Sequence, residues 1–349
     1  VLQIVQIGGI AGRDLIMFVT YGQPLPMHPN DNFQWPTQIV SNNSNQPETS
    51  EEYRYRNALL TSVDQAWIKD FLDCALHTKV EHHLRLKKRP DAIRRPTHGI
   101  VNTAIESEIT YEKGYSAETL FRDMGQEGRT LLILGEAGSG KTITLVKLAK
   151  SLIELYQENP NLKLPVIFSL SFWAKKQKSI FAWLIDEFSD KYGIPRKLAH
   201  KWLKKGNLIL LLDGLDEMKP DDRNLCANKL NEFISFHPLT ELVVCCRRKE
   251  YYEINVQRLK LLGAIDLQPL SESQVDNFLK QGGEQLKALR GLLQSNKDLQ
   301  KIAQNPLVLN VMSLAYRDSP IEDLSILDKG DFCLQNLFND YINKMFQHR

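Results

Sequence analysis

Short, continuous apolar runs alternate with stretches of helical periodicity over the middle of the chain, from about residue 129 to residue 268. The apolar runs predict strands at residues 130–134, 165–170, 208–212, 242–246 and 264–267, and helical stretches such as 142–156 and 221–236 separate them. A strand that is apolar at every position is buried on both faces, and a helix between successive strands is the connection that a parallel sheet requires. We therefore predict a three-layer α/β core with a parallel five-stranded sheet.

A different pattern follows residue 269, where the strands stop and apolar residues recur at helical spacing. This periodicity predicts helices at residues 271–280, 284–293, 297–304, 307–316 and 332–346. We expect residues 269–349 to form an all-helical subdomain.

The part of the chain before the core is a small mixed region. Residues 1–52 hold two β-like runs, 2–7 and 15–21, and then a polar stretch from 41 that reads as a linker because it buries little apolar surface. An amphipathic helix is predicted from residue 53 to about 86, and residues 79–95 are strongly basic. We interpret the basic stretch as a solvated hinge, with phosphate contact as the alternative. The predicted domains are 1–52 and 53–93, both of unassigned role, then 94–268 and 269–349.

Charge and cysteine content narrow the function classes. The 44 Lys and Arg residues nearly balance the 42 Asp and Glu residues, so the sequence does not indicate nucleic acid as a partner. Its five cysteines are widely spaced and lack a CxxC pair, which fits a reducing, cytoplasmic location better than a disulfide framework or a zinc site. No apolar run approaches the ~20 residues that span a bilayer. Because the chain starts at Val1 and stops within a helical pattern at Arg349, we expect it to be part of a longer protein.

A glycine-rich motif lies between the first predicted core strand and the helix that follows it. It matches GxxxxGK[ST] and consists of Gly135, Glu136, Ala137, Gly138, Ser139, Gly140, Lys141 and Thr142, with Ile143 next in the helix. Glycines let successive backbone N–H groups turn towards phosphates, and the helix N-terminus adds a favourable partial positive charge. We expect Lys141 to reach the β- and γ-phosphates of a nucleotide and the Thr142 hydroxyl to bind Mg²⁺. The motif does not distinguish an adenine nucleotide from a guanine nucleotide.

Carboxylates follow the strand predicted at residues 208–212. Asp213 stands at the end of this strand, where open parallel sheets place their sites, and it is the expected partner of Mg²⁺. Asp216 and Glu217 come one turn later, and either one can polarise an attacking water as a general base. These positions predict a site that hydrolyses a nucleoside triphosphate.

Together the motifs resemble the NACHT family of signal-transducing P-loop ATPases, of the STAND class, and especially its bacterial members. The resemblance covers residues 94–349 and rests on the runs at 132–142, 170–173, 211–217 and 243–247. It implies that Arg247 is the sensor that contacts the γ-phosphate, although Cys245 and Cys246 stand where the family usually has Ser or Thr. It also implies that Pro306 packs against an adenine base. The next arginine, Arg248, is expected to be a surface charge.

The function that this resemblance implies is a switch driven by ATP and ADP. ADP holds the helical subdomain shut, exchange for ATP opens it, and opened protomers oligomerise to activate an effector. The resemblance further implies slow regulatory hydrolysis, a region beyond residue 349 that senses an unknown ligand, and a role in signalling or antiviral defence. A continuously cycling remodelling ATPase uses the same motifs and is the alternative. A P-loop kinase is a third reading, against which the acidic strand and the missing acceptor-binding lid argue.

Overall fold

A computed structural model describes residues 2–6, 17–21, 49–72, 84–94, 110–111, 116–125, 128–255 and 257–318. The chain divides into two compact units, Val1–Ser44 and Asn45–Arg349. In the first unit, β1 (Leu2–Gln6) and β2 (Met17–Tyr21) pair antiparallel, so both predicted β-like runs are strands. The polar stretch at 41–48 and the helix predicted at 332–346 lie outside the described residues.

The second unit is built on a seven-stranded sheet with the order β4-β3-β9-β5-β8-β7-β6. Its five parallel strands are β5 (Thr130–Gly135), β6 (Leu164–Ser169), β7 (Leu208–Asp213), β8 (Glu241–Arg247) and β9 (Gly263–Leu267). These are the five strands that the apolar runs predicted, each within two residues of the expected bounds. Their side chains are buried along almost the whole length of each strand, as the continuous apolar runs require.

The predicted count of five strands is wrong, because two short strands extend the sheet beyond β9. β3 (Leu86–Lys88) pairs antiparallel with β9 and with β4 (Thr110–Tyr111). The basic stretch interpreted as a solvated hinge therefore contains a strand. β3 is only three residues long and lies next to the edge strand β4, and in it Leu86 is buried while the lysines that follow remain partly exposed. Because the lysines of β3 are charged, the pattern of hydrophobic residues did not predict this strand.

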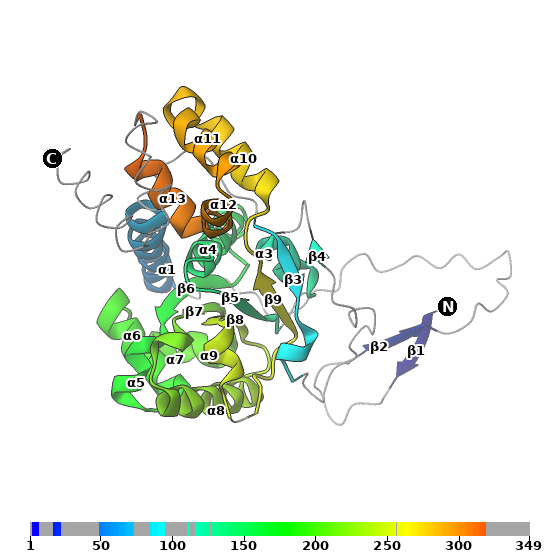
Figure 1. The fold of residues 1–349 in the computed structure, drawn as a ribbon. Coiled ribbons are helices and arrows are strands. Elements are labelled where there is room, and N and C mark those ends of the chain that lie inside the picture. The colour runs from blue at the N-terminus through cyan, green and yellow to red at the C-terminus, as the bar shows by residue number, and fades with distance from the viewer. Residues whose placement is uncertain are drawn as a thin grey trace, which may run out of the picture. The chain divides into compact units, whose positions relative to one another are not determined.

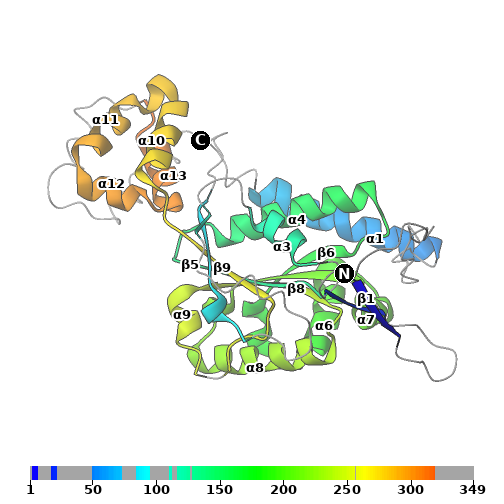
Figure 2. The same cartoon turned by 90° about the vertical axis from the view of Figure 1, so that its right-hand side faces the viewer.

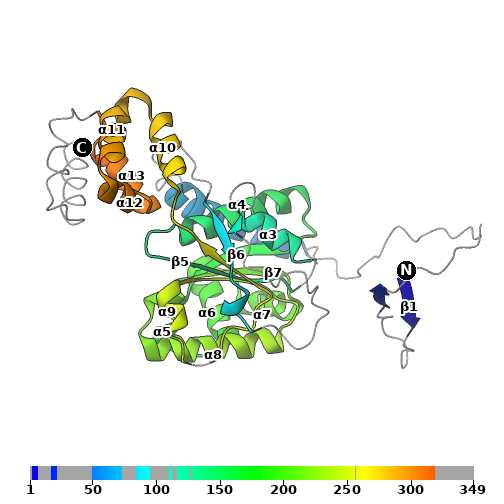
Figure 3. The ribbon, with the colours of Figure 1, turned by 45° about the vertical axis from the view of Figure 1, so that its right-hand side comes forward.

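Helices cover both faces of the sheet and make the core three layers deep. One face carries α1 (Ser50–Val63), α3 (Ala117–Asp123) and α4 (Lys141–Glu158), as Figures 2 and 3 show. The other face carries α5 (Trp173–Lys176), α6 (Ile180–Tyr192), α7 (Arg196–Lys205), α8 (Pro220–Phe236) and α9 (Arg248–Tyr252). Both layers and the sheet share one cluster of buried apolar side chains.

The first helix of this unit begins at Ser50, inside the stretch predicted to be a linker, and continues as a π-helix over Asp64–Leu72. Thr49 caps it by accepting a hydrogen bond from the Glu52 N–H at 3.1 Å. Glu52 itself is buried and accepts a hydrogen bond from the Trp202 indole of α7 at 2.8 Å. A Thr followed three residues later by Glu is a helix-start signal, and this signal marks the true beginning of α1.

After β9 the chain forms a group of helices (Figure 1). This helical group has its own cluster of buried apolar side chains. Its elements are α10 (Glu272–Gln281), the 3₁₀ turn η6 (Gly283–Leu286), α11 (Lys287–Ser295), α12 (Lys297–Ala303) and α13 (Pro306–Ala315). Side-chain caps from Ser271, Asn296 and Asn305 start three of these helices. The helices predicted up to residue 316 are therefore present, and the division into domains stays a prediction.

Truncating Leu59 in α1 tests whether this helix is part of the core. Leu59 is fully buried in the core cluster, so we expect Leu59→Ala to lower the free energy of unfolding by about 2–5 kcal/mol. Tyr53 lies in the same helix but is 50% exposed, and Tyr53→Ala should change that free energy by less than about 0.5 kcal/mol. Denaturant titration measures both, and equal effects would contradict the placement of α1.

Candidate functional site

The glycine-rich loop joins β5 to α4 at the carboxyl end of the sheet. Gly138 and Gly140 adopt φ angles of 73° and 93°, in the left-handed region that favours glycine. Gly140 is the residue directly before α4, so the loop closes onto the N-terminus of an 18-residue helix. The Lys141 ammonium donates to the carbonyls of Gly135 at 3.1 Å and Glu136 at 2.9 Å. A cation and a helix N-terminus therefore meet at one loop, which suits an anion.

Thr142 and Asp213 meet next to this loop. The Thr142 hydroxyl donates to Asp213 Oδ2 at 2.6 Å, and the Gly214 N–H donates to Asp213 Oδ1 at 3.0 Å. Burial raises the pKa of Asp213, and these two hydrogen bonds oppose that rise. A hydroxyl and a carboxylate are oxygen ligands of the kind that Mg²⁺ uses. The pair predicted from sequence to hold Mg²⁺ is thus brought together, and its donors fit that ion.

Asp216 is held by Arg247. The Arg247 N–H donates to Asp216 Oδ1 at 3.0 Å, and the Arg247 Nε lies 2.9 Å from Asp216 Oδ2. The carboxylate is buried, whereas the arginine side chain is 46% exposed, so both oxygens of Asp216 are engaged while the guanidinium keeps a free approach to solvent. Asp216 therefore acts on the orientation of the arginine at the end of β8.

Glu217 has a different environment, although it is the neighbour of Asp216. It ends the 3₁₀ turn η5 (Leu215–Glu217), and burial raises the pKa of its carboxyl group, with a further rise from the charge of Asp213. The nearby Ser171 hydroxyl lowers that pKa. Gly214, with φ of 81°, lies under the carboxylate, because a Cβ at this position would come within 2.9 Å of Glu217 Oε2. Both candidate bases interact with Asp213, since the charge of Asp216 raises the pKa of Asp213 and the charge of Asp213 raises the pKa of Glu217.

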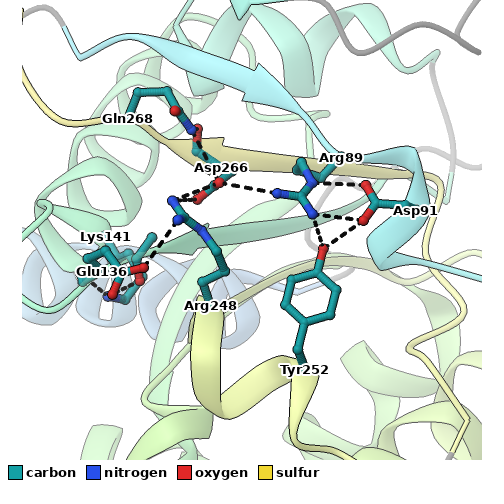
Figure 4. A network of polar contacts seen from close by, with 9 residues as sticks. Arg89, Asp91, Glu136, Lys141, Arg248, Tyr252, Asp266 and Gln268 are labelled. Atoms are coloured by element: carbon teal, nitrogen blue, oxygen red, sulfur yellow. Dashed lines mark hydrogen bonds and ion pairs between the residues drawn. The ribbon is translucent and has the colours of Figure 1, made fainter.

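Arg248 is not the plain surface charge that the sequence suggested. Its guanidinium lies 2.9 Å from the buried carboxylate of Asp266 on β9 and 3.2 Å from Glu136 of the glycine-rich loop. Figure 4 shows the arginine between these two carboxylates. The Arg248 side chain therefore connects the glycine-rich loop to β9, the strand after which the helical group begins. Sequence reasoning missed this because Asp266 lies within an otherwise apolar strand.

Asp266 also connects to the end of β3. Arg89 lies 3.7 Å from Asp266 and makes a two-point contact with Asp91 at 2.8 and 2.9 Å (Figure 4). The hydrogen bond from Arg89 lowers the pKa of Asp91 to about 2, and burial raises the pKa of Tyr252, whose hydroxyl donates to the same carboxylate, to about 12. These pairings hold the basic stretch against the sheet and argue that Arg89 is structural rather than a phosphate ligand.

The helical group touches the glycine-rich loop directly. The Asn305 side-chain amide donates to the carbonyl of Ala137 at 2.8 Å, and the Leu307 N–H donates to the carbonyl of Gly138 at 3.2 Å. The same Asn305 side chain accepts from the Leu307 N–H at 3.0 Å and so caps α13. Pro306 occupies the first turn of that helix, as its fixed φ favours. Asn305 was not among the predicted site residues, although an Asn directly before a helix-starting Pro is a cap signal.

The other predicted loop residues have less direct roles. Ser139 is buried, and its hydroxyl has no hydrogen-bond partner within the described parts of the chain. Ile143, in the first turn of α4, is partly buried and packs against the core cluster. Cys245 and Cys246 are fully buried, and burial raises the pKa of both thiols. No helix within the described residues is long and apolar enough to cross a membrane.

Comparison with known proteins gives a family match for the central part of this unit. Residues 129–284 match the family model of the NACHT domain. None of the curated proteins compared with the chain matches it. Among solved structures, PCH-2 of C. elegans is similar at 12% identity and a TM-score of 0.27, over 63% of this chain and 61% of that one. AMPPCP-bound DnaA from Aquifex aeolicus is similar at 11% identity and a TM-score of 0.29, over 62% and 60%.

The chain thus spans about three fifths of each of these two solved structures, with shares of 61% and 60%. The matched range starts one residue before β5 and contains all five parallel strands, the glycine-rich loop, the carboxylates that follow β7 and the arginine at the end of β8. Asn305 and Pro306 lie beyond it. The similarity to the NACHT domain therefore covers the strands, the loop and the carboxylates of the candidate site, at residues 129–284.

Proposed function

We propose that this chain binds ATP and ADP with Mg²⁺ and hydrolyses ATP slowly. Its helical group then takes a different position according to which of the two nucleotides is bound. The contact between the glycine-rich loop and the start of α13 carries this proposal. Two hydrogen bonds join the loop carbonyls of Ala137 and Gly138 to Asn305 and Leu307, so the loop that holds phosphates is also the docking point of the helices. A ligand on this loop can favour one of two packings if its contacts differ between them.

The glycine-rich loop and the end of β7 bind the nucleotide and its metal ion. Lys141 and the loop N–H groups bind the phosphates, and Pro306 packs on the adenine base, as the family resemblance implies. Thr142 and Asp213 hold Mg²⁺, which neutralises charge on the β- and γ-phosphates when bound. We propose adenine rather than guanine on the strength of the resemblance alone.

The two neighbouring carboxylates, Asp216 and Glu217, have different roles in hydrolysis. Glu217 accepts a proton from the attacking water while the water oxygen bonds to the γ-phosphorus and the bond to the ADP oxygen breaks. Arg247, aimed by Asp216, stabilises the negative charge on the transferring phosphoryl group. The proton leaves Glu217 for solvent or for the released phosphate. Asp216 keeps both of its oxygens on Arg247 and so does not serve as the base.

The role of the whole protein follows the family resemblance and is proposed on that basis. We place it among the STAND proteins of bacteria, as a cytoplasmic switch in signalling or antiviral defence that oligomerises when a further region senses its ligand. The rival function is a remodelling ATPase that cycles continuously.

One experiment separates the switch from its rival. Purified protein is denatured, the released nucleotide is identified by chromatography, and ATP turnover is followed on the same sample. Bound ADP in near-equal amount to the protein, with slow turnover, supports the switch. An empty site with fast turnover supports the cycling ATPase. A bound guanine nucleotide would overturn the proposal that the site prefers adenine.

Replacing the loop lysine tests phosphate binding. Because the Lys141 ammonium is the cation of the loop, Lys141→Ala should abolish nucleotide binding in a fluorescent-nucleotide titration. Lys150→Ala is the matched control, since Lys150 is exposed further along α4 and should bind nucleotide normally. Tight binding by the Lys141 variant would refute the proposed phosphate site.

The two carboxylates after β7 are distinguished by neutral replacements. Glu217→Gln should keep nucleotide affinity and lower the hydrolysis rate by about 10²–10⁴-fold, the usual contribution of a general base. Asp216→Asn should lower the rate less, because the arginine it positions is still present. Single-turnover hydrolysis measures both rates, and the reverse order would make Asp216 the base.

The contact between the loop and α13 is tested at Asn305. Removing its amide donor costs about 1 kcal/mol of net hydrogen bonding, which corresponds to roughly fivefold faster release of labelled ADP in a chase experiment. Asn305→Ser keeps an oxygen that can cap α13 but is too short to reach Ala137, whereas Asn305→Ala loses both contacts. We expect faster release from both variants. Faster release from the alanine variant alone would show that only the helix cap matters.

A further inference from the structure

Arg248 joins two carboxylates that come from different parts of the site. Its Nη2 contacts the Asp266 carboxylate at 2.9 and 3.0 Å, and its Nη1 lies 3.2 Å from Glu136 Oε1 (Figure 4). The side chain of Asp266 is 2% exposed, whereas that of Glu136 is 57% exposed. A buried carboxylate holds its charge partner firmly, because losing that partner leaves an uncompensated charge. Arg248 is therefore fixed at Asp266 and presents its other nitrogen to Glu136.

The pair of Arg248 and Asp266 crosses the strand on which the glycine-rich loop begins. In the sheet, β5 lies between β8 and β9. Arg248 directly follows β8, and Asp266 belongs to β9, where it stands opposite Leu134 of β5. The pair therefore connects the two neighbours of β5 near its carboxyl end. Because Glu136 is the first residue after β5, Arg248 meets the loop at the point where the loop leaves the sheet.

The backbone of Glu136 contacts the cation of the loop. Its carbonyl accepts a hydrogen bond from the Lys141 ammonium at 2.9 Å and another from the Ser139 N–H at 3.2 Å. A shift of Glu136 would therefore move a carbonyl that orders two other residues of the loop. The position of Arg248 thus influences the part of the loop that is proposed to bind phosphates.

Asp266 also lies beside the start of the helical group. The Gln268 side-chain amide donates to Asp266 Oδ2 at 3.2 Å. Two residues later, the Leu270 N–H donates to the carbonyl of Gln304 at 2.8 Å. The residue after Gln304 is the cap of α13 that donates to the loop. The loop is therefore held at adjacent residues, by Arg248 on one side and by the helical group on the other.

Resting on the proposed function, we propose that Arg248 is a positioning residue that holds the glycine-rich loop in the shape that receives the phosphates of a nucleotide. Asp266 fixes the arginine, and the arginine fixes Glu136. In this scheme Arg248 touches neither the nucleotide nor the attacking water, and it changes affinity through Glu136. An arginine suits this role because its planar guanidinium presents several donors in a fixed geometry, whereas the ammonium of a lysine is a compact point charge.

Nucleotide affinity tests the contact from both of its ends. The probe is N-methylanthraniloyl-ADP, followed by fluorescence. Glu136→Ala removes the carboxylate, and Arg248→Lys keeps a charge beside Asp266 but loses the second donor to Glu136. We expect each variant to bind about three- to fivefold more weakly, the upper range for a partly exposed ion pair. Glu158→Ala and Lys249→Ala, matched changes of exposed charges in α4 and α9, should bind normally.

Combining the two changes separates positioning from a general weakening of the fold. If Arg248 acts through Glu136, the double variant should bind about as weakly as either single variant, because both changes remove the same contact. In Arg248→Lys, the single-turnover hydrolysis rate at saturating ATP should fall by a smaller factor than the affinity. Thermal denaturation checks that the variants fold. If Arg248→Lys does not fold, the comparison of Glu136→Ala with Glu158→Ala decides.

The outcomes separate this inference from the proposed function. A wild-type protein that binds no nucleotide overturns both. Normal wild-type binding with unchanged affinity in Glu136→Ala overturns the role of Arg248 alone. Losses that multiply in the double variant, to about tenfold or more, also overturn it, because the two residues would then act separately. A hydrolysis rate that falls more than the affinity in Arg248→Lys overturns it too, since Arg248 would then act on the chemical step.

Discussion

The parallel pairing of β5, β8 and β7 is the constraint on which the site depends. Parallel strands deliver all their carboxyl ends to the same edge of a sheet. Here that edge receives the glycine-rich loop after β5, Arg247 at the end of β8 and Asp213 at the end of β7. The register places Gly135 opposite Arg247, so the loop and the arginine start from neighbouring backbone positions. Groups far apart in the sequence therefore meet without any long-range side-chain contact having to bring them together.

Much of this arrangement follows from local sequence. Strands buried on both faces must be apolar throughout, and all five such runs form the parallel part of the sheet. The glycine-rich loop is also encoded locally, because its backbone conformation requires glycine at Gly138 and Gly140. Once the strands and the loop are recognised, the closeness of Thr142 and Asp213 follows from the geometry of the fold.

The rest depends on tertiary contacts that leave little trace in a local pattern. β3 is held by backbone pairing to β9 and by a single buried leucine, so its lysines dominate the sequence signal. The partner of Arg248 is Asp266, which lies inside an apolar strand and shows its charge pairing only in three dimensions. Such residues are polar groups in unremarkable positions until the fold gives them neighbours.

The contact of Asn305 with the loop changes how substitutions in the glycine-rich motif should be interpreted. A Cβ at position 138 would lie 2.7 Å from Asn305 Oδ1 and 3.0 Å from Leu307 Cβ, so any side chain there would press on the helical group as well as strain the loop. A variant at Gly138 would thus combine lost ligand affinity with a displaced helix, and its phenotype could not be ascribed to an empty site. One substitution in the loop would therefore produce a strained backbone and a displaced helical group together.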